Sequence, residues 1–112
     1  MSYLVTRKED GDITLTPCKL LGTESPMGPK ISTVNLSGRG VAVLWFIKFL
    51  SRDENCLDTH EAAGRIYRAS YDAAGNLFLE DKRNEEFNVV GFSEIEIPDV
   101  LAKLTEAPQE SD

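Results

Sequence analysis

The chain has little of the side-chain chemistry on which most enzymes depend. Its 112 residues contain one histidine, His60, and two cysteines, Cys18 and Cys56, which lie far apart in the sequence. A structural zinc site needs four ligands, and the spacing of these three residues matches no zinc pattern. The composition therefore disfavours catalysis and predicts neither a metal site nor a cofactor.

Long hydrophobic runs are also missing. Residues 1–7 contain no apolar stretch before the first charges, so we expect no secretory signal there. The most apolar segment, 40–50, is interrupted by Lys48 and is shorter than the roughly 20 residues that cross a bilayer. We therefore expect no membrane contact, and two cysteines without a secretory context predict free thiols and a cytoplasmic location.

Positive charge is scarce in the second half of the chain. Residues 53–112 contain five Lys or Arg and fifteen Asp or Glu, whereas residues 1–52 contain seven Lys or Arg and four Asp or Glu. The net charge of the chain is −7. An acidic surface repels phosphate backbones, so we expect no direct binding of DNA or RNA. Such a surface would attract a basic protein partner, although acidity also keeps small proteins soluble without any partner.

The apolar content that remains predicts one folded domain, 1–105, followed by a disordered acidic tail, 106–112. Alternating residues in 3–8 and 13–20 around an Asp-Gly pair predict a β-hairpin, with Tyr3, Val5, Ile13 and Leu15 facing the core. Segment 22–30 is rich in turn formers and predicts a loop, and 31–36 a short strand.

The run 41–50 is apolar on nearly every side and suits either of two structures. Ser37 as an N-cap, with Lys48 and Arg52 on a solvent-facing side, favours a buried helix. The β-branched and aromatic content favours a central strand. We lean to the helix, and in both cases Trp45 and Phe46 belong to the centre of the core.

The second half predicts a β-meander and a terminal helix. Segments 65–71 and 77–81 would be strands joined by a turn at 72–76, although a helix over 58–74 also fits the apolar spacing. Segment 87–97 predicts a strand in which Gly91 marks a bulge, and Pro98 begins a helix. The predicted fold is therefore α+β, an antiparallel sheet of N-terminal hairpin and C-terminal meander packed by one or two helices.

The leading functional hypothesis is a non-catalytic binding protein. If strands 77–81 and 87–97 pair, their carboxylates would gather into one acidic patch that binds a basic protein. That patch would consist of Glu80, Asp81, Glu85, Glu86, Glu94 and Glu96. The protein would act alone or as a homodimer, in the manner of an inhibitor, an immunity factor or a mobile-element accessory protein.

Two other hypotheses remain open. An apolar pocket between sheet and helix would bind a small molecule, and its lining would be Trp45, Tyr67, Tyr71 and Phe92, unless these aromatics simply fill the core. A thiol enzyme would use Cys56 as nucleophile and His60 as base, with Asp58 or Glu61 orienting the imidazole. Such residues in one polar segment are more often incidental.

Overall fold

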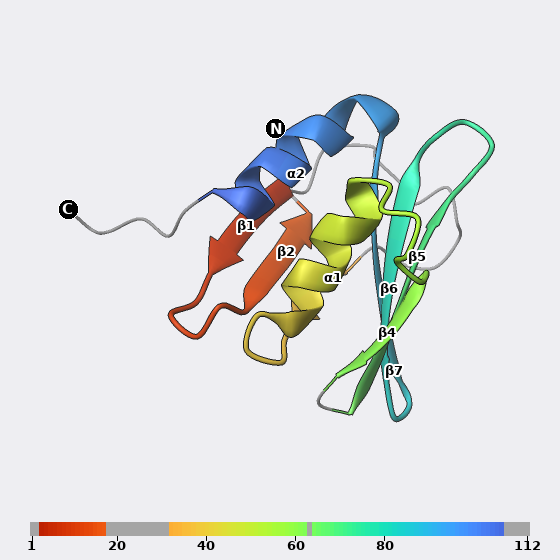
Figure 1. Ribbon diagram of the computed structural model, residues 1–112. Helices are drawn as coiled ribbons and strands as arrows, with labels where there is room; N and C mark the ends of the chain where they lie inside the picture. The colour runs from red at the N-terminus through yellow and green to blue at the C-terminus, as the bar shows by residue number, and fades with distance from the viewer. Residues whose placement is uncertain (1–2, 18–31, 63, 107–112) are drawn as a thin grey trace.

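The computed structural model describes residues 3–17, 32–62 and 64–106, and within them seven strands form two antiparallel sheets (Figure 1). The first sheet has the order β1 (Tyr3–Arg7), β2 (Ile13–Pro17) and β3 (Val34–Leu36). The second has the order β4 (Thr59–Ala62), β5 (Arg65–Tyr71), β6 (Leu77–Arg83) and β7 (Glu86–Phe92). The α+β class is confirmed, with the hairpin and the meander in separate sheets rather than in one.

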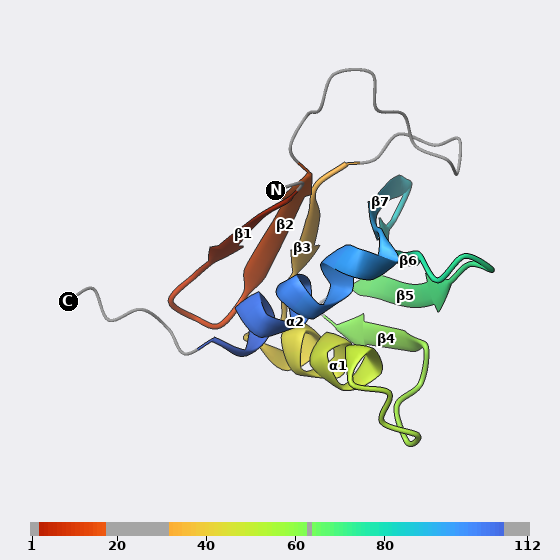
Figure 2. The ribbon, with the colours of Figure 1, turned by 90° about the horizontal axis from the view of Figure 1, so that it is seen from above.

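Two helices complete the domain, α1 (Val41–Leu50) and α2 (Ile97–Thr105), the latter preceded by a short 3₁₀ helix, η1 (Glu94–Glu96). Figure 2 shows both helices in the angle between the two sheets. The expected loop 22–30, Cys18, the side chain of Tyr3 and tail residues 107–112 lie outside the described residues.

The predicted N-terminal hairpin is confirmed. Val5 pairs with Leu15 and Arg7 with Ile13. Ile13 and Leu15 are buried, as expected. The turn closes with the Lys8 N–H donating to the Asp12 carbonyl at 2.8 Å, and Gly11 takes a φ of +95°, which L side chains rarely adopt. This hairpin supplies one wall of the core.

Helix α1 resolves the ambiguity of the run 41–50 in favour of the helix. Five of its ten residues are buried: Ala42, Val43, Trp45, Phe46 and Leu50. Ser37 is not the N-cap, and this prediction is wrong. The cap is Gly40, whose N–H donates to Asp12 Oδ1 at 3.1 Å, while Ser37 is engaged with Tyr67.

The strand interpretation of 65–81 is confirmed, and the alternative helix over 58–74 is wrong. Asp72 Oδ1 accepts the N–H groups of Ala74 and Asn76, both at 2.9 Å, and Gly75 has a φ of +89°. This turn joins β5 to β6. Residues 59–62 form the edge strand β4, which is held by main-chain pairing to β5.

The predicted strand 87–97 is too long. Strand β7 ends at Phe92, where Ser93 and Glu96 form a capping box, and Ile95 is 86% exposed in η1. Gly91 makes no bulge but pairs regularly with Phe78, whose ring covers it. Along β7, Val90 and Phe92 face the core, whereas Val89 points to the opposite side of the sheet.

The two sheets meet where β3 runs beside β6 and β7. The Ser32 N–H donates to the Val89 carbonyl at 2.8 Å, and the Val89 N–H donates to Ser32 Oγ at 3.2 Å. At the other end of the domain, Arg7 of β1 donates to the main-chain carbonyl of Lys103 in α2. One hydrophobic core, with residues from both sheets and both helices, fills the space between these contacts.

Candidate functional site

A polar row crosses the inner face of the four-stranded sheet. His60, Tyr67, Asp81 and Asn88 are successive register partners on β4, β5, β6 and β7. Because paired residues of antiparallel strands point to the same side, all four side chains face the core. Polar groups are costly in such a place unless they find partners, so each of them needs an explanation.

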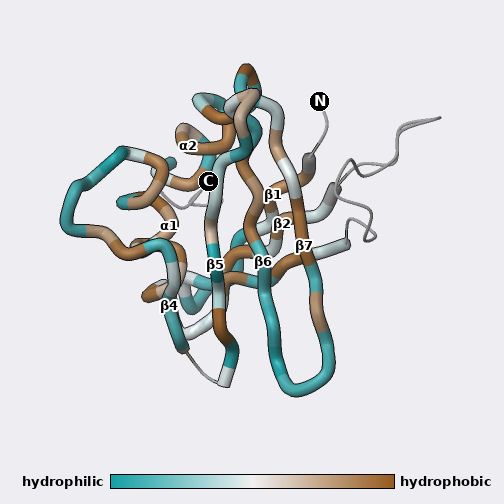
Figure 3. Tube along the Cα trace, turned by 90° about the vertical axis from the view of Figure 1, so that its right-hand side faces the viewer, coloured by the Kyte–Doolittle hydropathy of each residue, from teal (hydrophilic) through white to brown (hydrophobic). Residues whose placement is uncertain are grey.

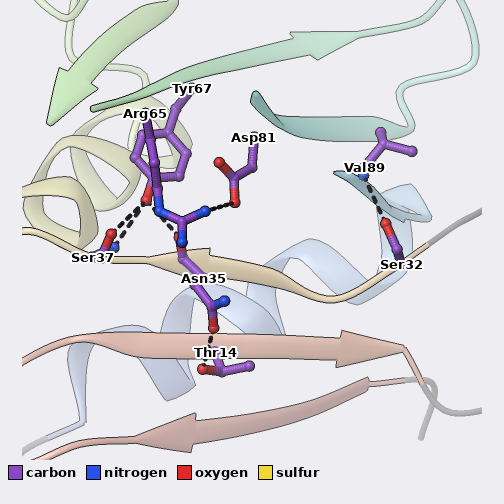
Figure 4. A network of polar contacts seen from close by, with 8 residues as sticks. All are labelled: Thr14, Ser32, Asn35, Ser37, Arg65, Tyr67, Asp81 and Val89. Atoms are coloured by element: carbon purple, nitrogen blue, oxygen red, sulfur yellow. Dashed lines mark hydrogen bonds and ion pairs between the residues drawn. The ribbon is translucent and has the colours of Figure 1, made fainter. Parts of the chain in front are cut away.

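Asp81 is the most deeply buried charge of this row. Its side chain is 1% exposed, and Oδ2 accepts a hydrogen bond from Arg65 Nη1 at 2.8 Å (Figure 4). The other carboxylate oxygen, Oδ1, accepts no hydrogen bond of normal geometry from the described residues. Burial raises the pKa of the Asp81 carboxyl, while the Arg65 charge and the nearby Asn35 N–H oppose the rise. The result is a buried ion pair whose anion is only partly satisfied.

Tyr67 connects the sheets at the same level. Its hydroxyl donates to the Asn35 carbonyl on β3 and accepts the Ser37 N–H at 2.9 Å. Asn35 Oδ1 in turn accepts the Thr14 hydroxyl at 2.7 Å, so the chain of contacts reaches β2 (Figure 4). Burial raises the pKa of Tyr67, and the hydrogen bonds from Ser37 partly offset that rise. A neutral, fully bonded phenol of this kind has a structural role.

His60 and Cys56 both contact Trp45 rather than each other. The imidazole stacks on the indole with ring centroids 5.5 Å apart, and its buried Nε2 has no hydrogen-bond partner in the described part of the chain. The Cys56 thiol donates to the carbonyls of Trp45 and Leu57 at 3.6 and 3.4 Å. Burial and the Asp53 charge raise the pKa of Cys56, which keeps the thiol neutral.

The residues suggested to orient the imidazole lie elsewhere. Glu61 pairs with Ile66 and therefore projects from the opposite side of β4, away from His60. Asp58 is exposed and precedes the strand, where its carbonyl accepts the Ala69 N–H at 2.9 Å. The geometry supplies neither an activated thiolate nor an oriented base.

The four aromatic residues expected around a pocket are packed into the core or its border. Trp45, Tyr67 and Phe92 are 7%, 0% and 1% exposed, and the first two rings are 6.0 Å apart. Tyr71 is partly buried, stacks on Phe49 at 5.5 Å and lies beneath the Arg52 guanidinium. Close packing accounts for these residues without a ligand.

The six carboxylates expected in one patch are spread over the sheet. Asp81 points inward and its neighbour Glu80 outward, as alternation along a strand requires. Glu85 and Glu86 lie at the tip of the β6–β7 hairpin, where they line a polar hollow with Arg83 and Asn84. Glu94 and Glu96 belong to η1 at the other end, where Glu94 lies beside Gly75 and Glu96 accepts the Ser93 N–H. These six carboxylates therefore do not share one face.

Three of the exposed large apolar side chains of the described residues lie on α1 and in the loop that follows it, a surface that the sequence did not predict. Val41 and Leu44 of α1 are 50% and 61% exposed, and Leu57 in the following loop is 72% exposed. Val41, Leu44, Leu57 and exposed Lys48 together make up the α1 surface. The sequence contains a signal for this surface, because the run 41–50 is apolar on nearly every side. A helix at the surface of a domain buries only one side, so some of these apolar residues must be exposed.

The described residues contain neither a candidate metal site nor a membrane-spanning helix. No group of three or more His, Cys, Asp or Glu in this part of the chain is placed to hold a metal ion. Nor does any helix described here have the length and hydropathy needed to span a membrane. No protein-family model, curated protein or solved structure matches the chain.

Proposed function

We propose that this domain is a non-catalytic protein-binding module and that its partner docks on the α1 surface. The observation that carries the proposal is the exposure of three apolar side chains, Val41, Leu44 and Leu57, at 50%, 61% and 72%. Single exposed apolar residues are ordinary, whereas a group of them with a polar border is typical of interfaces.

The members of the α1 surface are neighbours. Val41, Leu44 and Lys48 follow one another at helical spacings of three and four and so share one stripe of α1. The following loop is tied to the flank of this stripe, because Trp45 Nε1 donates to the Leu57 carbonyl at 2.8 Å. This bond holds the Leu57 main chain beside α1, where its exposed side chain would add to the apolar stripe.

The charges nearby indicate the chemistry of the partner. The loop that carries Leu57 also carries Asp53, Glu54 and Asp58, all exposed, against the cations Lys48 and Arg52. With a net charge of −7 on the chain, a partner with an apolar anchor between basic side chains is favoured. An inhibitor, an immunity factor or a mobile-element accessory protein would work in this way, and the free thiol of Cys56 suits a cytoplasmic setting.

The two competing functions receive less support. A pocket lined by Trp45, Tyr67, Tyr71 and Phe92 would need these side chains to be accessible. At most 7% of Trp45, Tyr67 and Phe92 is exposed, and Tyr71 is partly buried against Phe49. A thiol enzyme would need a Cys56 pKa below the ordinary value, and burial raises it.

A comparison of three purified chains tests the proposal. Tagged wild-type chain, Leu44→Asp and Leu4→Asp are used to capture proteins from a cell lysate at low and high salt. Leu4 is 57% exposed on β1 and serves as the matched control for Leu44. We expect a protein held by the wild type and by Leu4→Asp at low salt and lost with Leu44→Asp. Equal capture by all three chains would refute the proposal.

A further inference from the structure

Strand β4 is an edge of the four-stranded sheet. Among the described strands it pairs only with β5, and Figure 3 shows it at the left-hand end of the sheet. The Ala69 N–H donates to the Asp58 carbonyl at 2.9 Å, which fixes the phase of the main-chain pairing. Because bonded positions alternate along antiparallel strands, the N–H and C=O groups of His60 face β5, whereas those of Thr59 and Glu61 face away from it.

The outward groups of Thr59 and Glu61 are unpaired within the described part of the chain. The hydrogen bonds among the described residues include none to the main chain of either residue on this side. The opposite edge differs, since the Ser32 N–H donates to the Val89 carbonyl of β7 at 2.8 Å. Sheets often protect a free edge with lysine or proline, and the sequence of β4, Thr-His-Glu-Ala, contains neither. Strand β4 can therefore accept a further strand.

Helix α1 lies along this edge strand, on the inner side of the sheet. Trp45 stacks on His60 with ring centroids 5.5 Å apart. A Cβ on Gly38, which precedes the helix, would lie 3.2 Å from the Cβ of Ala62 at the end of β4. The start of α1 is therefore near the end of β4, and the helix and the strand run antiparallel.

The exposed side of α1 is next to the contact with β4. Val41 and Lys48, four residues before and three after Trp45, are exposed and share its side of the helix. Leu57, two residues before β4, is bonded to Trp45 through its carbonyl at 2.8 Å. A side chain that points inward from a strand added beside β4 would meet this apolar group.

We propose that the partner of the α1 surface adds an extended segment to β4, as a fifth strand of the sheet. This inference rests on the function proposed above and specifies how the partner docks. The main chain of the segment bonds to the outward groups of Thr59 and Glu61. Its side chains alternate, so that every second one points inward and packs against Val41, Leu44 and Leu57.

Charge determines what else the segment carries. Residues 53–62 contain four carboxylates and neither Lys nor Arg: Asp53, Glu54, Asp58 and Glu61. A second copy docked through the same edge would bring two such sets together across a two-fold axis, and like charges in an interface are costly. The segment is therefore basic at the outward positions, above all opposite Glu61, and apolar at the inward ones.

A synthetic peptide of alternating lysine and isoleucine is the probe, and fluorescence anisotropy measures its binding to the full chain. We expect binding by the wild type that weakens at high salt. Methylation of the lysine main-chain nitrogens should weaken binding about tenfold or more, because the outward-pointing residues present their N–H groups to β4. Methylation of the isoleucine nitrogens, which face away from β4, is the matched control and should change little. Equal binding of the two methylated peptides would overturn strand addition.

Three variants separate this inference from the proposed function. Glu61→Pro removes an N–H that β5 does not use, Glu61→Gln removes only the charge, and Leu44→Asp disrupts the α1 surface. Thermal unfolding checks that each is folded, and the methylated peptides test the same bonds on the wild type. We expect Glu61→Pro and Leu44→Asp to abolish peptide binding and Glu61→Gln to weaken it less.

Each other outcome is decisive. A peptide lost with Leu44→Asp and retained by Glu61→Pro would overturn strand addition and leave docking on the α1 surface in place. A peptide lost with Glu61→Pro and retained by Leu44→Asp would refute both. Absence of peptide binding to the wild type would overturn the proposed segment, and lysate capture with Leu44→Asp still tests the α1 surface separately. A dimer in sedimentation equilibrium that Glu61→Pro abolishes would assign the edge to a second copy and overturn the proposal.

Discussion

The hydroxyl of Tyr67, at the centre of β5, donates a hydrogen bond to the main-chain carbonyl of Asn35 on β3 and thereby joins the two sheets of the domain. The same hydroxyl accepts the Ser37 N–H at 2.9 Å. It therefore bonds the main chain of the residue before and the residue after Leu36, the last residue of β3. Main-chain groups buried without a partner cost free energy comparable to a lost hydrogen bond. A single phenol thus holds a segment that leads into α1.

Removal of this hydroxyl should be costly. Tyr67→Phe leaves the Asn35 carbonyl and the Ser37 N–H without their partner, and we expect a loss of about 1–3 kcal/mol in the free energy of unfolding. Urea denaturation measures the change. Tyr71→Phe is the control, because Tyr71 is held by ring contacts with Phe49 and Arg52, and it should cost less than about 0.5 kcal/mol. Equal losses in both variants would contradict the role given to Tyr67.

The Arg65–Asp81 pair should make stability depend on pH in an unusual direction. Burial raises the pKa of the Asp81 carboxyl in the folded state, so the folded chain binds a proton more readily than the unfolded chain. The contribution of Asp81 to stability is therefore largest below its unfolded pKa, about 3.9, and is lost as the pH rises through the folded pKa.

Asp81→Asn isolates this effect, because the amide does not titrate. Unfolding free energies of the wild type and the variant are compared at several values between pH 4 and pH 7. We expect the wild type to lose stability relative to Asp81→Asn as the pH rises. If the stability difference between wild type and Asp81→Asn stays constant with pH, or grows in favour of the wild type, then Arg65 and not burial determines the pKa of the Asp81 carboxyl.

Gly91 is required by the ring of Phe78. A Cβ at position 91 would lie 2.7 Å from Phe78 Cε1, so Gly91→Ala should cost about 1–3 kcal/mol through overpacking. Phe78→Leu in the same chain should recover part of that loss, because the smaller side chain makes room. Thermal unfolding of the two single variants and the double variant measures the coupling. Strict additivity would show that the close approach is not the cause.

The thiol of Cys56 should react slowly. Burial and the Asp53 charge raise its pKa, so at pH 7 to 8 a smaller fraction is thiolate than in free cysteine. In a Cys18→Ser background, alkylation by iodoacetamide should be slower than for a model peptide, and Asp53→Asn should accelerate it. Alkylation faster than that of the peptide would revive the thiol-enzyme hypothesis.

Local features of the fold were predictable from the sequence because they depend on neighbouring residues. The Asp-Gly pair at 10 and 11 and the pair Asp72 and Gly75 each specify a turn by their own backbone preferences. The end of β7 was predictable too, since Ser93 and Glu96 before Pro98 have the spacing of a capping box. The alternation of 87–97 concealed this signal.

Contacts between distant segments could not be predicted in the same way. The polar row depends on the register of four strands, and nothing near Asp81 indicates that Arg65 will reach it from β5. Ser37 has the residue type of an N-cap, but Tyr67 from the other sheet engages it instead. The junction of the two sheets likewise depends on the contact of Ser32 with Val89, 57 positions apart in the sequence.

The central claim, that a protein partner docks on the α1 surface, is tested most directly by site-specific photo-cross-linking. A photoreactive amino acid replaces Leu44 in one chain, Leu57 in a second and Leu4 in a third, and each is irradiated in a cell lysate. We predict one shared cross-linked protein for positions 44 and 57 that is missing at position 4, and its yield should fall at high salt. Identical cross-linking patterns at all three positions would contradict the claim.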